Sequence, residues 1–315
     1  MPQFSVDAYL PLMIKRETII IDCDPGIDDA VALLLAFASP EELDVKAVTT
    51  VAGNVPLHRT EANARRIRDL AGRGEVPIHA GCPRPLIKAL KTADEIHGKT
   101  GLDGSDLPDP ASHLAPGHGA DVLRQEISTA PGGITLLPVG PLTNVAHALA
   151  ARPEFAREVS NIVVMGGSTG PGNVTPHAEF NFHVDPHAAH IVFESGAPIV
   201  MHGLNVTHQV RAKPDWIQAL RALDTTVGHT TAGMLTFYDS DNDPALHDVL
   251  TVGYLLWPEL FSGEARRVDI VTEGIEAGRS IVRDAGDGVP NATVMLDVDA
   301  DEFLARLLNR LSRYS

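Results

Sequence analysis

The fold of this chain is decided by the stretch Ile19-Ile20-Ile21-Asp22-Cys23-Asp24-Pro25-Gly26-Ile27-Asp28-Asp29-Ala30. Its three isoleucines predict a buried strand, and the apolar residues 30–37 continue at helical spacing. Four carboxylates lie around the Pro25-Gly26 turn, and like charges this close need a bound cation or raised pKa values. We therefore expect a divalent-metal site at the carboxyl end of a buried strand. The plainer alternative is that Asp28 caps the helix and the other acids face solvent.

Strand-like and helix-like segments alternate along most of the chain. Strands are predicted at residues 18–22, 43–51, 76–80, 134–139, 161–165, 199–202 and 292–297. Helices are predicted at residues 28–38, 57–71, 120–130, 145–151, 185–194 and 300–311, and most of 206–236 is helical. This order predicts an α/β fold with an open, mainly parallel, doubly wound sheet and helices on both faces.

Three segments depart from the alternation. Residues 85–119 are rich in Gly, Pro, Asp and His, and a loop this long in a compact domain is more often functional than idle. Residues 268–272 and 278–283 predict an antiparallel pair at the edge of the sheet. Residues 1–15 show no clear period. Because no repeat or linker divides the sequence, we expect one domain over residues 1–315.

Composition limits the classes of partner. The net charge of −16 argues against nucleic-acid and membrane partners, because both favour basic surfaces. The two cysteines, Cys23 and Cys82, do not make a disulfide framework. The N-terminus lacks the pattern of a signal peptide, and no apolar run reaches membrane-spanning length. We therefore expect a cytoplasmic protein.

Polar residues collect after the predicted strands. In an open parallel sheet, segments distant in sequence meet outside the carboxyl ends of the strands. Carboxylate and amide oxygens suit calcium or magnesium, and a phosphate-binding Gly-rich loop and a Gly-x-Ser-x-Gly motif are both missing. The residues concerned are Asp22, Asp24, Asp28, Asp29, Asn54, Val139, Asn173, Glu179, Asn181, Asp241, Asp243, His247 and Asp248.

Several of these residues also have a plainer explanation. Asn54 and Asn173 each follow a glycine and could serve a turn. Asn181, between two phenylalanines, could be a buried strand residue. His97 and His247 could each be a surface-loop histidine, and taken singly these explanations stay open.

Eight motifs, in the same order, resemble those of the inosine-uridine-preferring nucleoside hydrolases. The resemblance extends over most of the chain. The motifs are residues 22–30, Thr49-Thr50-Val51-Ala52-Gly53-Asn54, Glu95-Ile96-His97-Gly98, Gly140-Pro141-Leu142-Thr143-Asn144, Met165-Gly166-Gly167, Ala178-Glu179-Phe180-Asn181, Asp185-Pro186 and His247-Asp248.

The resemblance implies hydrolysis of the N-glycosidic bond of ribonucleosides to ribose and free base. It implies a calcium ion held by Asp24, Asp29, Asp248 and the backbone carbonyl of Val139. Asp24 would also be the general base on a calcium-bound water, and His247 the general acid for base departure. A homodimer or homotetramer is implied as well.

The resemblance also implies a set of substrate contacts. Asp22 would support the metal ligands from behind. The substrate-binding residues would be Asp28, Asn54, His97, Met165, Asn173, Glu179 and Asn181.

The chain departs from the family pattern in two places. His247-Asp248 is followed by Val249 where the family has Pro, and the segment 238–248 is short. Phe237 and Tyr238 are the nearest candidates for contacts with the base, since Trp216 and Trp257 lie in apolar helical patterns typical of core. His247 favours the broader or pyrimidine-preferring members over the purine-specific ones.

Two other functions fit parts of the sequence. Asp22-Cys23-Asp24 after a strand is also typical of Asp-based phosphatases, although Gly26 stands where those enzymes have Thr. A calcium-dependent nucleoside- or sugar-binding protein without hydrolysis would use the same acids. Intact Asp24 and His247 argue against that second alternative.

Overall fold

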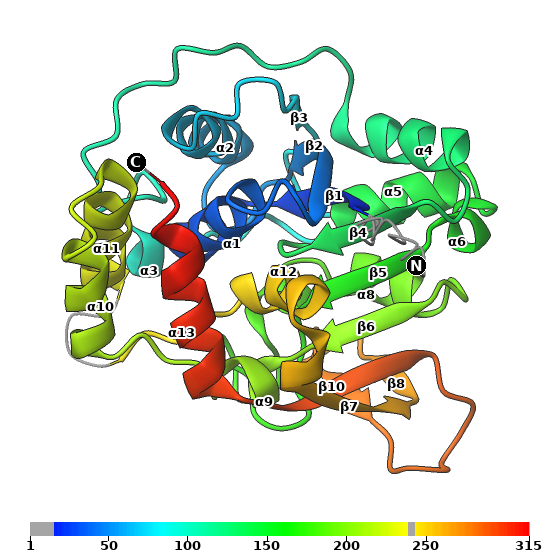
Figure 1. Cartoon of the computed structure of the whole chain (residues 1–315). Helices are drawn as coiled ribbons and strands as arrows, with labels where there is room; N and C mark the ends of the chain where they lie inside the picture. Colours follow the sequence, from blue (N-terminus) through cyan, green and yellow to red (C-terminus); the bar gives the residue numbers. More distant parts are fainter. Residues whose placement is uncertain (1–15, 239–242, 315) are drawn as a thin grey trace, which may run out of the picture.

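An eight-stranded sheet forms the centre of the molecule in the computed structural model, which describes residues 16–238 and 243–314 (Figure 1). Its order is β3-β2-β1-β4-β5-β6-β10-β7, parallel from β3 to β10, with β7 antiparallel to β10. The predicted mainly parallel sheet is therefore confirmed. The strands are β1 Glu17–Cys23, β2 Leu43–Thr50, β3 Ile78–Ala80, β4 Ile134–Pro138, β5 Asn161–Met165, β6 Ile199–His202, β7 Phe261–Arg266 and β10 Ala292–Val298.

β1 is the central strand, and both of its faces are covered. Ile19 and Ile21 pack into the hydrophobic cluster on one face of the sheet, while Ile20 packs into the cluster on the other. All three side chains are fully buried. A continuous β-branched run is the pattern expected of a strand between two helical layers.

Helices cover both faces of the sheet (Figure 1). One layer contains α1 Ile27–Phe37, α2 Leu57–Leu70, α9 Leu204–Thr207, α10 Pro214–Arg221, α11 Thr226–Tyr238, α12 Val249–Leu256 and α13 Ala300–Leu311. The opposite layer contains α4 Gly119–Thr129, α5 Thr143–Ala151, α6 Phe155–Glu158, α7 Phe180–Val184 and α8 Pro186–Phe193. Two short helices complete the set, α3 Asp94–His97 and the 3-10 helix η1 Pro258–Leu260.

Three details of the sequence-based fold were wrong. The predicted pair at residues 268–272 and 278–283 is not at the sheet's edge but forms a separate two-stranded sheet, β8 Val268–Ile270 and β9 Ser280–Val282. The edge strand beside β10 is instead β7. Sequence analysis missed β7 because its side chains are polar and mostly exposed. Asn181 lies in helix α7 and not in a strand.

Residues 1–15 and Asp241 lie outside the described ranges. The single domain over residues 1–315 stays a prediction. In the described part of the chain, no helix is both long and apolar enough to cross a membrane.

The strand order reverses between β1 and β4. From β1 the chain proceeds to β2 and β3 on one side, and β4, β5 and β6 follow on the other. The loops that leave the carboxyl ends of β1 and β4 therefore diverge and leave a crevice between them. Asp24 follows β1 and Val139 follows β4, so both lie at this reversal.

Asp185 links three segments near the site, so its loss should destabilise the fold. Its buried carboxylate accepts hydrogen bonds from Leu86 N at 2.8 Å, Thr143 Oγ1 at 2.7 Å and Ala188 N at 3.1 Å. We expect Asp185→Ala to lower the free energy of unfolding by about 2–4 kcal/mol, because buried donors lose their acceptor. Urea unfolding measures this.

Asp299→Ala is the matched control. Asp299 is also a helix N-cap, but it is exposed and accepts one bond, from Glu302 N at 3.1 Å. Its loss should cost about 1 kcal/mol or less. Equal losses for the two variants would contradict a linking role for Asp185.

Candidate active site

A cavity of about 260 Å³ lies at the carboxyl ends of the central strands. It brings together residues from segments as far apart as Asp28 and Asp248. Tyr238 also lines it, whereas Phe237, the other aromatic candidate, is not among its lining residues. The sequence-predicted residues that line it are Asp28, Asn54, His97, Val139, Met165, Asn173, Glu179, Asn181, His247 and Asp248.

Four other predicted acids belong to the described residues but do not line the cavity. Asp22, Asp24 and Asp29 are buried behind the lining, whereas Asp243 is only partly buried. Asp29 holds the Pro25-Gly26 turn together. Its Oδ1 accepts the backbone N–H of Asp24 at 3.1 Å, and its Oδ2 accepts that of Gly26 at 2.9 Å. This geometry places Asp29 in the first turn of α1, where the helix dipole favours a negative charge.

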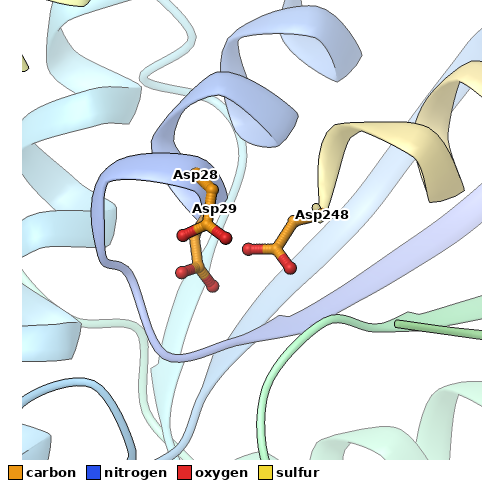
Figure 2. A group of neighbouring side chains, drawn as sticks. All are labelled: Asp28, Asp29 and Asp248. Carbon is orange, nitrogen blue, oxygen red and sulfur yellow. The ribbon is translucent and has the colours of Figure 1, made fainter. Parts of the chain in front are cut away.

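Carboxylate oxygens of Asp28, Asp29 and Asp248 lie within 4.8 Å of one another. Figure 2 shows Asp28 and Asp29 at the start of α1 and Asp248 reaching toward them from the start of α12. All three residues are buried. Two segments more than 200 residues apart thus place their carboxylates in one site.

Asp24 sits between glycines that leave room for its carboxylate. Its Oδ2 accepts the backbone N–H of Asn54 at 2.7 Å. A Cβ atom at Gly53 or at Gly140 would overlap the Asp24 carboxylate. Asp24 Oδ1 and Asp28 Oδ1 are buried without a hydrogen-bond partner among the described residues.

Burial makes ionised carboxylates costly at this site. Burial, and next the Asp29 charge, raise the pKa of Asp28 to about 8, and burial raises that of Asp29 to about 6. The pKa values of Asp24 and Asp248 also lie well above the ordinary range, again through burial and neighbouring carboxylates. Buried carboxylate oxygens without donors fit a hard divalent cation. The tightest group contains Asp28 in addition to the predicted ligands Asp29 and Asp248.

Amide side chains hold the neighbouring groups in place. Asn54 Nδ2 donates to Asp29 Oδ2 at 3.1 Å, and Asn181 Nδ2 donates to the carbonyl of Val139 at 2.9 Å. Glu179 caps α7 and accepts backbone N–H groups of Gly167 and Asn181. Burial raises the pKa of Glu179 to about 7. Asn173 is exposed, and its Oδ1 accepts the backbone N–H of Phe180 at 3.0 Å.

Asp22 is held by two residues that sequence reasoning missed. Thr49 Oγ1 and Asn144 Nδ2 donate to Asp22 Oδ1 at 2.5 and 2.7 Å. Burial raises the pKa of Asp22 to about 7. Both partners stand in motifs already recognised in the sequence, and the position of Asn144 after a strand was the available signal.

The two histidines of the cavity are both held through Nδ1. His97 Nδ1 accepts the backbone N–H of Ile27 at 3.1 Å, and its ring lies 5.1 Å from that of Tyr238. His247 Nδ1 lies 2.8 Å from Thr207 Oγ1. Desolvation by the surrounding groups lowers the pKa of each to about 3, so both imidazoles are neutral at pH 7.

Known proteins resemble this chain in both sequence and fold. The sequence profile of the inosine-uridine preferring nucleoside hydrolase family matches residues 19–305. The chain belongs to this family. It is a nucleoside hydrolase, and the predicted phosphatase and binding-protein alternatives lose their support.

Individual relatives agree with this membership. A pyrimidine-specific ribonucleoside hydrolase, RihA of Photobacterium profundum, is 45% identical over 307 residues, which cover 94% of this chain and 99% of the relative. The plant nucleoside hydrolase PpNRh1 superposes with a TM-score of 0.90 at 34% identity, covering 94% and 99% of the two chains. A purine-preferring ribonucleoside hydrolase from Gardnerella vaginalis has a TM-score of 0.89 at 32% identity, covering 94% and 98%.

Removing divalent cations should make stability depend on pH. The folded-state pKa values of Asp28 and Asp29 lie above their ordinary value of 3.8, so the folded state binds extra protons. The stabilisation that these extra protons give the folded state is therefore complete below about pH 4, and it is lost as pH rises to about 8. We expect the chelated protein to lose up to about 1.4 kcal/mol per pH unit for each such proton.

Thermal unfolding with chelator at pH 5, 6, 7 and 8 measures this slope, and added Ca²⁺ should remove most of it. Asp28→Asn should flatten the slope in chelator, because one titrating group is gone. A chelated protein with the same melting temperature at pH 5 and pH 8 would contradict the expectation.

The space around Asp24 gives a second prediction. Gly140→Ala should lower nucleoside hydrolysis at least 100-fold, because the added Cβ would displace the Asp24 carboxylate. Gly170→Ala is the control, since a Cβ there meets nothing within 4 Å. Release of ribose from uridine is the measurement. A fully active Gly140→Ala protein would show that the position of Asp24 does not matter.

Proposed function

We propose that this nucleoside hydrolase uses a calcium ion, an aspartate base and a histidine to cleave the N-glycosidic bond. The observation that carries the proposal is the group of buried carboxylates next to the cavity, with oxygens of Asp24 and Asp28 left without partners. Such oxygens need either protons or a cation, and a cation also serves hydrolysis.

The proposed calcium ligands are the carboxylates of Asp24, Asp29 and Asp248 and the carbonyl of Val139. All four offer the hard oxygen atoms that calcium prefers. The group of Asp28, Asp29 and Asp248 supports two of these assignments. Because Asp28 belongs to the same group, we propose that its carboxylate also lies near the ion when the ion is bound. When bound, the ion would lower the pKa of a water and orient the ribose hydroxyls.

Asp24 is the proposed general base. Its Oδ2 accepts the N–H of Asn54, and its Oδ1 is buried with no hydrogen-bond partner among residues 16–238 and 243–314, so we assign to Oδ1 the proton of the attacking water. The oxygen of that water bonds to C1′ of the ribose while the bond from C1′ to the base breaks. The electron pair of the broken bond leaves with the base, and the carboxylates stabilise the positive charge that develops on the ribosyl group.

The proposed ribose contacts are made by polar side chains around the cavity. Asp28 offers an open carboxylate oxygen, whereas Asn54 and Asn181 already hold other groups of the site. The full proposed set of substrate-binding residues is Asp28, Asn54, His97, Met165, Asn173, Glu179 and Asn181. Asp22 is proposed to support the site through Thr49 and Asn144.

His247 is proposed to assist departure of the base. With a pKa near 3 the free imidazole is neutral, so it acts by hydrogen bonding to the charge that develops on the base. We also propose a preference for pyrimidine nucleosides, supported by His247 and by the name of the relative at 45% identity. The family supports assembly as a homodimer or homotetramer.

The test is release of ribose from uridine, cytidine, inosine and adenosine, with and without chelator. We expect hydrolysis that is fastest on uridine or cytidine, lost in chelator and restored by Ca²⁺. Asp24→Asn should still bind Ca²⁺ weakly. Its rate of nucleoside hydrolysis should fall by a factor of about 10²–10⁴, which is the usual contribution of a general base.

Asp94→Asn is the matched control, because Asp94 is exposed on α3 and does not line the cavity. It should keep the full rate. Hydrolysis that survives chelation would overturn the calcium proposal, and near-normal turnover by Asp24→Asn would overturn the assignment of the base.

A further inference from the structure

Thr207 makes a contact with the site that the proposed mechanism does not yet use. It lies at the end of α9, forty residues before His247, and its side chain is fully buried. Its Oγ1 lies 2.8 Å from His247 Nδ1. No other hydrogen bond of this hydroxyl occurs in residues 16–238 and 243–314.

The hydroxyl is not needed to form the helix. The backbone N–H of Thr207 donates to the carbonyl of Gly203, the N-cap of α9, as a helix requires. A threonine hydroxyl in a helix often bonds the carbonyl four residues back, but here it is directed to the imidazole instead. The side chain therefore serves His247 rather than its own helix.

The backbone fixes the distance between the two residues. Leu246 N donates to Val210 O at 2.9 Å, and Ala212 N donates to Pro244 O at 2.9 Å. These bonds join the segment just after α9 to the segment just before His247. The hydroxyl and the imidazole are thus held near each other by the main-chain pairing of residues 210–212 with residues 244–246, which is how a rigid supporting contact is built.

The contact selects which nitrogen of His247 is available to the cavity. A hydroxyl proton given to Nδ1 leaves the hydrogen of the neutral imidazole on Nε2. If the imidazole were protonated, the hydroxyl would accept from Nδ1, and Nε2 would still carry a hydrogen. In the remaining arrangement, the neutral imidazole carries its hydrogen on Nδ1 and none on Nε2. The buried hydroxyl would then accept from Nδ1, and its own proton would be left without an acceptor.

We propose that Thr207 is a positioning residue for the hydrolysis reaction, because it orients His247 so that Nε2–H is presented to the departing nucleobase. This inference rests on the proposed role of His247. Thr207 itself does not touch the substrate cavity, since it is not among the lining residues. Its effect is therefore confined to the step in which the base leaves.

The experiment compares two substrates that differ in their need for this help. The uracil of uridine is a poor leaving group and needs a hydrogen-bond donor. By contrast, p-nitrophenyl β-D-ribofuranoside releases a phenolate that needs no such donor. We expect Thr207→Val to lower kcat on uridine about 10-fold, with KM and the rate on the p-nitrophenyl riboside nearly unchanged. Thr207→Ser, which keeps the hydroxyl, should restore the uridine rate.

His247→Ala separates this inference from the proposed function. It should lose about 100-fold on uridine, and adding Thr207→Val to it should cause no further loss. A fully active His247→Ala protein would overturn the role of His247 and the positioning role together. An impaired His247→Ala protein beside a fully active Thr207→Val protein would overturn the positioning role alone.

Two further results would overturn the positioning role. One is an equal loss on both substrates in Thr207→Val, which would indicate a general structural effect. The other is a ¹⁵N spectrum of the wild-type protein in which His247 Nε2 carries no hydrogen. Turnover of the p-nitrophenyl riboside reports that the variant is folded, and Thr207→Ala replaces Thr207→Val in both comparisons if the valine protein does not fold.

Discussion

Several carboxylates are buried together beside the end of β1, and the neighbouring loops hold them there. Asp24, Asp28, Asp29 and Asp248 are nearly inaccessible to solvent and lie close together. Burial disfavours ionisation of all four, and neighbouring carboxylates add to this effect at Asp24, Asp28 and Asp248. Backbone N–H groups at the turn after β1 offset part of this cost. Oxygens without partners remain, and a bound cation would relieve that remaining cost while serving the reaction.

The sheet makes this arrangement possible by collecting loops at the reversal between β1 and β4. The charged groups come from the start of α1 and the start of α12, and neutral amides come from other strand ends. These amides act on the acids before any substrate is bound. Asn54 orients two carboxylates, and Asn181 fixes the carbonyl of Val139. A change at either amide would therefore disturb the proposed metal site as well as ribose binding.

Sequence reasoning predicted the features that rest on local pattern. The alternation of strands and helices predicted the mainly parallel sheet, and the acids after the isoleucine run predicted a candidate site at the end of β1. Strand β7 was missed because an exposed, polar edge strand lacks an apolar pattern. Thr207 was missed because a single threonine in an apolar segment carries no signal, and its partner lies forty residues away. Whether His247 faced solvent could not be decided, since that depends on pairing between segments distant in sequence.

A cavity rich in carboxylates helps one half of the reaction and opposes the other. Negative charge stabilises the ribosyl cation but repels the electron pair that leaves with the base, so the base needs donors that are not themselves acids. In the proposed mechanism, neutral histidines would meet this need without neutralising the acids. If His97 were protonated, its Nδ1, 4.0 Å from Asp28 Oδ1, would pair with that carboxylate and compete with the proposed contact between Asp28 and ribose. Desolvation, which lowers the pKa of His97 and His247, therefore keeps the acids available and leaves the imidazoles as hydrogen-bond donors.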